Sequence, residues 1–147
     1  MLASEFTDHR KGTFAALWLD ASSAIKLADW CRANDVFCCD PEYFHCTVCY
    51  SSIAIPHAEA IAGNISANAT ILGWKNLGDH ATVLLMDCPI AKPIHDLLIR
   101  HGADTSYPEY ICHLTIDPEH RTRILPSKIP PFPLHFDRLV VQPAKEK

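Results

Sequence analysis

The sequence predicts an α+β fold made of two similar halves. Three observations carry this prediction: short runs rich in Val, Ile, Thr, Phe and Cys, helix-like segments between them, and a five-residue pattern that occurs twice. The pattern reads apolar-His-x-Thr-apolar, at residues 44–48 and 112–116. Its second histidine, His113, follows the first, His45, by 68 residues (113 − 45). Self-similarity at a fixed offset indicates an internal repeat.

Changes in hydrophobic period assign the elements of the first half. Asp20 and the serines after it are typical helix caps, and Leu27 and Cys31 recur behind them at helical spacing. Pro56 suits the first turn of a short helix. The expected elements are a strand, a helix, the strand of the first motif, a short helix and a strand, at residues 12–19, 20–34, 43–50, 56–66 and 69–75.

The second half repeats the main part of this order. Pro93 suits the first turn of a helix and Gly102 its end, whereas the polar segment 120–128 fits either a helix or a loop. The 68-residue offset places the first strand, the helix and the first motif on counterparts in this half, so we expect two lobes, at about 12–79 and 80–147. The expected elements are a strand, a helix, the strand of the second motif and a last strand, at residues 81–87, 93–101, 112–116 and 134–141.

Length and composition restrict the class of protein. A chain of 147 residues is long enough for one core, so we expect a single domain over 1–147. The net charge is −4 and there is no run of Lys or Arg, which argues against binding long DNA or RNA. No apolar stretch approaches the roughly 20 residues of a membrane span, and no signal-peptide pattern begins the chain. We therefore expect a cytoplasmic protein with no membrane partner.

The seven cysteines are expected to be reduced core residues. Cys46-x-x-Cys49 has the spacing of a zinc or redox pair, but residues three apart on a strand point to opposite faces. There is no second Cys-x-x-Cys. We expect no metal site there.

The doubled motif predicts a catalytic site. Because strand side chains alternate, His45 and Thr47 share one face, and His113 and Thr115 share another. Histidine serves as general base or general acid near neutral pH, so two imidazoles on opposite sides of a phosphodiester act in line. The hydroxyls of Thr47 and Thr115 can donate hydrogen bonds to the phosphate oxygens.

This chemistry calls for no cofactor and no metal, and the acidic residues beside the motifs form no recognisable ligand pattern. A single histidine in a strand is more often structural than catalytic. Two copies with the same apolar flanks, one in each half, favour a functional pair. The sequence leaves open which histidine is the acid and which the base.

The two His-x-Thr motifs, at 45–47 and 113–115, resemble the signature of the two-histidine (2H) phosphoesterase superfamily, which has the LigT-like fold. The resemblance covers most of the chain. It implies a bilobal, pseudo-symmetric α+β fold, with antiparallel sheets lining a central cleft and helices outside. It also implies metal-independent cleavage of phosphodiesters, with His45 and His113 as acid and base and with Thr47 and Thr115 binding phosphate.

The small size is similar to that of one branch, the phage anti-CBASS nucleases, which destroy the cyclic di- and trinucleotide signals of bacterial antiviral immunity. The resemblance implies that two aromatic residues sandwich nucleobases, and Phe14 and Trp74 match their places. Phe14 departs from the family's usual tyrosine, which removes a hydroxyl and keeps a stacking face.

The expected reaction opens a 3′–5′ linkage of a cyclic oligonucleotide by attack of the neighbouring 2′-hydroxyl. Two alternatives remain at this stage. One is an RNA 2′,3′-cyclic phosphodiesterase of the same superfamily, against which the acidic charge counts. The other is a non-catalytic sponge that binds cyclic nucleotides, against which the completeness of both motifs counts.

Overall fold

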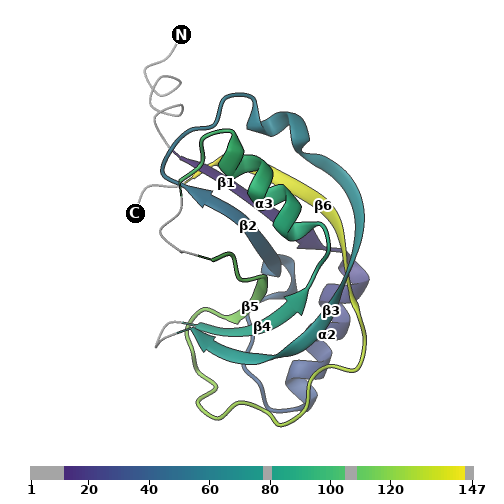
Figure 1. The fold of residues 1–147 in the computed structure, drawn as a ribbon. Helices are drawn as coiled ribbons and strands as arrows, with labels where there is room; N and C mark the ends of the chain where they lie inside the picture. The colour runs from purple at the N-terminus through teal and green to yellow at the C-terminus, as the bar shows by residue number, and fades with distance from the viewer. Residues whose placement is uncertain (1–11, 78–80, 105–108, 145–147) are drawn as a thin grey trace, which may run out of the picture.

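Strands and two helices make up most of the protein in the computed structural model (Figure 1), which describes residues 12–77, 81–104 and 109–144. The helices are α2 (Ala21–Ala33) and α3 (Ala91–Arg100), and two short 3₁₀ turns are η1 (Pro41–Tyr43) and η2 (Ala58–Ile61). The strands are β1 (Thr13–Leu19), β2 (His45–Ser51), β3 (Gly63–Leu77), β4 (Ala81–Asp87), β5 (His113–Asp117) and β6 (Leu134–Pro143).

The strands form one antiparallel sheet in the order β2-β1-β6-β3-β4-β5. The antiparallel sheets expected for the two halves are continuous with each other, because the 15-residue β3 pairs with β6 near its start and with β4 near its end. The motif strands β2 and β5 are the two edges of this sheet. The sheet is curved, and β2 and β5 come into contact with each other (Figure 1).

The element order β1-α2-β2-β3 is followed by the similar order β4-α3-β5-β6. The last strand of each of these two groups pairs with a strand of the other group: β3 pairs with β4, and β6 pairs with β1. The two groups are therefore interlocked through β3 and β6. The division into lobes at 12–79 and 80–147 remains a prediction.

Helix α2 forms where the caps and spacing predict it. The Asp20 carboxylate accepts a 2.7 Å hydrogen bond from the backbone N–H of Ser23, which satisfies a free donor of the first turn. Leu27 and Cys31 are fully buried and join the core that lies against the sheet. Helix α3 contributes Ala91 and Leu98 to the same core. Both helices therefore pack on the apolar side of the strands.

The helix expected over residues 56–66 is wrong. Only η2 forms there, and β3 begins at Gly63, whose φ of +144° suits glycine. From Ile65 to Leu72, more buried and exposed residues alternate with a period of two, which is the pattern of a strand. Helix α3 begins at Ala91, so Pro93 is its third residue. The segment 120–128 contains neither helix nor strand.

Candidate active site

The four motif side chains lie on the partly exposed face of β2 and β5. His45 and Thr47 are half-buried, and so are His113 and Thr115. The residues between and after them are wholly buried in the core: Cys46, Val48, Leu114 and Ile116. The apolar positions of each motif thus anchor its strand, while the histidine and the threonine face outward together.

The two imidazoles are held in the same way. The Nδ1–H of His45 donates to the backbone carbonyl of Tyr43 at 2.8 Å, and the Nδ1–H of His113 donates to the carbonyl of Ile111 at 2.9 Å. A carbonyl only accepts, so each Nδ1 carries the proton. In the neutral ring, Nε2 is then the basic nitrogen. Each carbonyl fixes both the tautomer and the orientation of its ring.

The surroundings of His45 favour its neutral form. Burial lowers the pKa of His45, and the charge of nearby His113 lowers that pKa further, while the hydrogen bond to the Tyr43 carbonyl opposes both effects. The influence of His113 on His45 connects the two edge strands electrostatically. Within the described residues, no hydrogen bond occupies either Nε2 atom or either threonine hydroxyl.

Tyr110 joins the two motif strands from behind. Its hydroxyl donates a 2.9 Å hydrogen bond to the backbone carbonyl of Thr47. Its ring stacks on His95 of α3 at a centroid distance of 4.5 Å, and His95 Nδ1 in turn lies 2.7 Å from the carbonyl of Val48. Two side chains from the second half of the chain therefore fix the backbone of the first motif.

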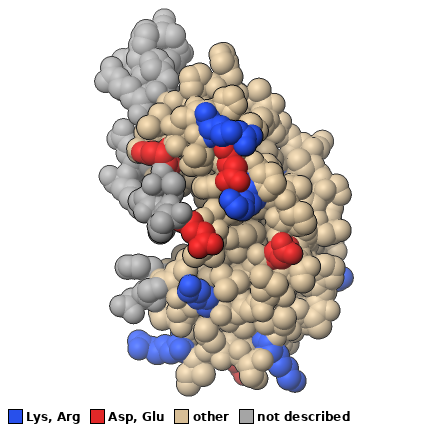
Figure 2. Space-filling model, viewed as in Figure 1, with Lys and Arg blue, Asp and Glu red and all other residues tan. Residues whose placement is uncertain are grey.

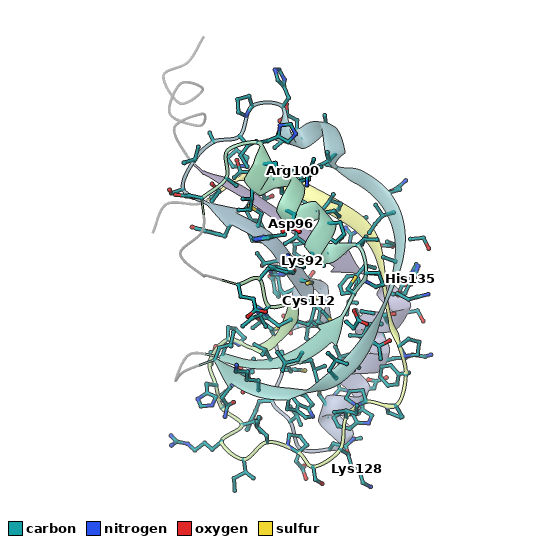
Figure 3. The ribbon with its side chains drawn as sticks, viewed as in Figure 1. Lys92, Asp96, Arg100, Cys112, Lys128 and His135 are labelled. Carbon is teal, nitrogen blue, oxygen red and sulfur yellow. The ribbon has the colours of Figure 1, made fainter. Side chains whose placement is uncertain are left out.

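A pair of free thiols lies at the same junction. The Sγ atoms of Cys46 and Cys112 are 3.7 Å apart, and the Cys46 Sγ lies 3.6 Å from the Tyr110 hydroxyl. Cys112 sits on the chain that leads into β5 (Figure 3). The contact with Cys112, together with burial, raises the pKa of Cys46, and burial raises the pKa of Tyr110. The Cys46 thiol and the Tyr110 hydroxyl are therefore protonated at neutral pH, whereas the contact with Cys46 lowers the pKa of the Cys112 thiol.

Phe14 lies beside the first histidine. It is half-buried on β1, opposite Tyr50 of β2, and its ring meets the His45 ring edge to face at a centroid distance of 5.8 Å. The structure therefore brings Phe14 to the face that carries His45. Its role in stacking remains a prediction.

Trp74 is not brought to the histidines. It pairs with Leu84 on β4, and Leu84 pairs with Leu114 on β5, whose side chain points away from the face of His113. The indole stacks on Trp30 of α2 at 6.1 Å, and its Nε1–H donates to the carbonyl of Lys128 at 2.9 Å. The strand register therefore places the Trp74 indole away from the face of the histidines, and its stacking role remains a prediction.

Trp18 instead supplies the second aromatic ring of the site, and the sequence analysis missed it. Trp18 pairs with His45 across β1 and β2, and the two rings are tilted by 31° at a centroid distance of 4.7 Å. The signal was present in the sequence, because Phe14 and Trp18 lie four positions apart on one strand and so share a face. Because the neighbouring residues of the strand are apolar, the sequence alone does not distinguish Trp18 from a core residue.

Charged side chains are interspersed near the motif strands. On the face shown in Figure 2, basic and acidic groups alternate without a continuous basic stripe. Along α3, Lys92 and Asp96 form an i,i+4 ion pair at 3.1 Å, with Arg100 beyond them (Figure 3). In the three described ranges, no three His, Cys, Asp or Glu side chains gather as a metal site. No helix in these ranges is long and apolar enough to cross a membrane.

Several solved structures share this fold. E. coli LigT complexed with 3′-AMP matches with a TM-score of 0.64 and 14% identity, covering 93% of this chain and 90% of that one. E. coli LigT complexed with NADP⁺ matches with a TM-score of 0.65 and 12% identity, covering 93% and 89%. A further crystal structure of a phosphoesterase matches with a TM-score of 0.58. The predicted LigT-like fold is therefore confirmed.

Sequence relatives agree on one family. The sequence model of the family described as anti-CBASS protein Acb1 matches residues 11–146. The anti-CBASS protein Acb1 of Vibrio phage KVP40 is 31% identical over 120 residues, which cover 79% of this chain and 78% of the relative. The anti-CBASS protein Acb1 of Acinetobacter phage Ac42 is 26% identical over 114 residues, covering 76% of each chain. The chain therefore belongs to the Acb1 family of anti-CBASS proteins, and it has the fold of the LigT phosphoesterases.

Proposed function

We propose that the protein is a metal-independent phosphodiesterase that cleaves 3′–5′ linkages of cyclic di- and trinucleotide immune signals. The observation that carries the proposal is the matched pair of imidazoles, each held through Nδ1 by a backbone carbonyl with Nε2 left for chemistry. Membership of the anti-CBASS family supports the choice of substrate. The proposed place of action is the cytoplasm of an infected bacterium, where such signals are made.

His45 is the proposed general base and His113 the proposed general acid. The lowered pKa of His45 keeps its Nε2 free of a proton at neutral pH, as a base requires. His45 takes the proton of the ribose 2′-hydroxyl, whose oxygen attacks phosphorus, and His113 gives a proton to the departing 5′-oxygen. The P–O5′ bond breaks as the P–O2′ bond forms, so the ring opens to a linear product with a 2′,3′-cyclic phosphate.

Thr47 and Thr115 are the proposed phosphate ligands. Each lies two residues beyond a histidine on the same face of its strand, so its hydroxyl is placed to donate to a non-bridging oxygen. Such donors stabilise the extra negative charge of the transition state and hold the phosphorus in line with both imidazoles.

The test is to incubate the protein, in the presence of EDTA, with a panel of cyclic oligonucleotides and to identify the products by mass. A linear product with a 2′,3′-cyclic phosphate is expected from rings with 3′–5′ linkages. A ring with 2′-deoxyribose at the cleaved linkage is expected to resist cutting. His45→Ala and His113→Ala should each lose at least 10³-fold in kcat while keeping the folded circular-dichroism spectrum.

Two outcomes would contradict the proposal. Faster turnover of an RNA end that carries a 2′,3′-cyclic phosphate than of any cyclic oligonucleotide would favour an RNA-processing enzyme. If the protein bound a cyclic oligonucleotide tightly and all of it were recovered uncleaved after prolonged incubation, a non-catalytic sponge would be favoured.

A further inference from the structure

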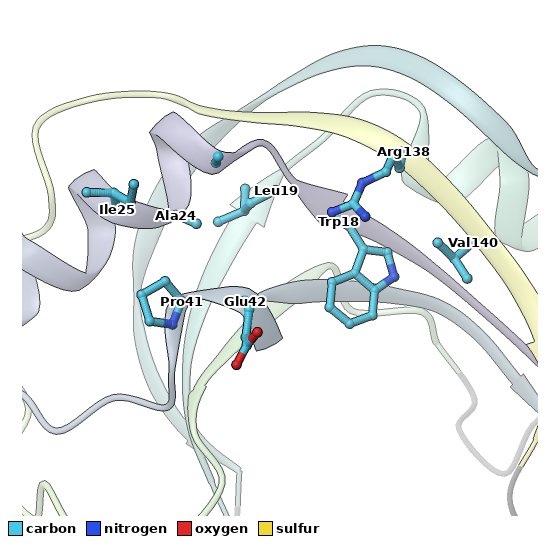
Figure 4. Close-up of a pocket in the computed structure, with 9 residues that line it drawn as sticks. Trp18, Leu19, Ala24, Ile25, Pro41, Glu42, Arg138 and Val140 are labelled. Carbon is cyan, nitrogen blue, oxygen red and sulfur yellow. The ribbon is translucent and has the colours of Figure 1, made fainter.

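A hollow opens beside Trp18, the cross-strand neighbour of His45. Its volume is about 510 Å³, within the range of about 300–1,000 Å³ that small-molecule sites occupy (Figure 4). One end is formed by Trp18, with Arg138 and Val140 of β6 beside it. The other residues that line it are Leu19, Ala21, Ala24, Ile25, Pro41 and Glu42. The lining is therefore mostly apolar with one cation and one anion.

Trp18 connects this hollow to the histidine pair. Its ring is one cross-strand neighbour away from His45, with the centroids 4.7 Å apart. Its indole N–H is buried and has no hydrogen-bond partner among the described residues. This nitrogen is inaccessible, so what Trp18 offers to the hollow is its ring.

Arg138 and Glu42 supply the polar groups of the hollow. Arg138 pairs with Trp18 across β1 and β6, and its guanidinium carbon lies 5.9 Å from the centre of the indole ring. The side chain is 54% exposed, and within the described residues its ion-pair partner is the neighbouring Asp137. Glu42 lies on the exposed turn η1, on the opposite side of the hollow from Val140 (Figure 4). No hydrogen bond or ion pair engages Glu42 within the described ranges.

We propose that this hollow binds one nucleobase of the cyclic substrate, stacked between Trp18 and Arg138, with Glu42 reading its hydrogen-bonding edge. The inference rests on the proposed function and adds a base subsite to it. An aromatic ring and a guanidinium plane are both stacking partners for bases. Arg138 moves outward to admit the base, which its exposure allows.

The chemistry of Glu42 selects guanine. A carboxylate accepts hydrogen bonds and donates none, so it favours an edge with adjacent donors. Guanine presents N1–H and N2–H₂ side by side, whereas adenine presents one amino donor beside the N1 acceptor. The occupant is therefore a guanine of a cyclic dinucleotide whose cleaved phosphate lies at His45 and His113.

The first experiment measures the subsite without turnover. In a His113→Gln background, calorimetric titration with the 3′–5′-linked cyclic GMP–AMP dinucleotide should give a dissociation constant that rises at least tenfold on adding Trp18→Leu. Trp18→Phe, which keeps a stacking face, should restore most of the affinity. Trp30→Phe is the matched control, because Trp30 packs against Trp74 on the other face of the sheet and should leave the affinity unchanged.

The second experiment separates binding from chemistry in the active protein. Trp18→Leu should raise KM at least tenfold with less than a threefold change in kcat. A role confined to supporting the His45 ring would instead lower kcat at unchanged KM, and this result would overturn the proposal. Because cleavage by the unsubstituted protein is measured in parallel, a failure of the proposed function appears as the absence of product from every ring.

The third experiment tests whether Glu42 recognises the hydrogen-bonding edge of the base. The unsubstituted protein should prefer the guanine-containing ring over cyclic di-AMP in kcat/KM, and Glu42→Gln should reduce that preference at least fivefold. Glu59, an exposed acid on η2, supplies Glu59→Gln as the charge-matched control, which should leave the preference unchanged. An unchanged preference in Glu42→Gln, or a loss of equal size in Glu59→Gln, would remove Glu42 from the subsite.

Discussion

The hydroxyl of Tyr110 donates a 2.9 Å hydrogen bond to the backbone carbonyl of Thr47, so the segment that leads into β5 holds the strand of the first motif. Tyr110→Phe removes this hydrogen bond from a partly buried carbonyl. We expect a loss of about 1–2 kcal/mol in the free energy of unfolding and a lower kcat, because Thr47 is no longer held in place. Urea denaturation and steady-state kinetics measure these two effects.

Tyr43→Phe is the matched control for that change. The Tyr43 side chain is 57% exposed, and only its backbone carbonyl serves His45. It should therefore leave both stability and kcat unchanged. Equal effects of the two substitutions would show that the Tyr110 hydroxyl does not position the motif.

The lowered pKa of His45 predicts how activity depends on pH. If His45 is the base, kcat/KM rises with pH as His45 loses its proton, and the midpoint of this rise should lie below 6.5, the ordinary histidine value. Activity measured across the acid limb tests this. A midpoint at or above 6.5 would contradict the assignment of His45 as base.

The same shift predicts a change in stability with pH. Between the lowered folded pKa and the unfolded value near 6.5, the unfolded chain binds more protons at His45, so the free energy of unfolding rises with pH in that window. His45→Gln should flatten the rise. Denaturant unfolding of both proteins at several pH values provides the comparison, and an identical slope would exclude the effect.

Asp117, the last residue of β5, should be a major source of stability. Its side chain is fully buried, it accepts from the backbone N–H of Arg121 at 2.7 Å, and it pairs with the Arg121 guanidinium at 3.2 Å. Burial alone would raise the pKa of Asp117, but these hydrogen bonds and the Arg121 charge bring that pKa below its usual range. Asp117→Ala should cost about 3 kcal/mol in thermal or urea unfolding.

The stability that Asp117 contributes also rises with pH, as that of His45 does, but over a more acidic range. A carboxyl with a depressed folded pKa stabilises the protein above the unfolded value near 3.8 and loses this effect as the pH falls through the folded pKa. Asp117→Asn should therefore be less sensitive to acid in that range. Glu119→Gln, at a mostly exposed acid nearby, is the control and should change little.

The Asp20 carboxylate is expected to stabilise the protein through two separate contacts. Its carboxylate caps α2 through the N–H of Ser23 and also accepts from the Nδ1–H of His135 on β6 at 2.8 Å. Asp20→Ala should therefore cost more than the roughly 1 kcal/mol of a simple cap. Asp20→Asn, which keeps a capping oxygen, should recover part of the loss in the melting temperature. Equal losses in the two variants would show that the cap contributes nothing.

The sequence predicted those parts of the site that depend on local pattern. The alternation around His45 and His113 places each imidazole beside a threonine, and the caps of α2 depend on residues three apart. Trp74 could not be placed in this way, because its face depends on pairing across three strands and on an irregularity between Ile71 and Gly73.

Arg138 could not be placed from the sequence for the same reason. Arg138 meets Trp18 only because β6, from the end of the chain, pairs with β1. Such a contact between distant segments leaves no periodic mark in the sequence. Likewise, β3 extends far beyond the expected strand because β6 and β4 each pair with a different part of it.

The position of β2 and β5 at opposite edges of the sheet has a consequence for how the site can change. The gap between the two imidazoles is set by the bend of the four intervening strands as well as by the residues around it. Each of the five strand pairings contains an irregularity, and bulges alter local twist. Small insertions or glycine substitutions far from the histidines are therefore expected to widen or narrow the opening without altering either imidazole.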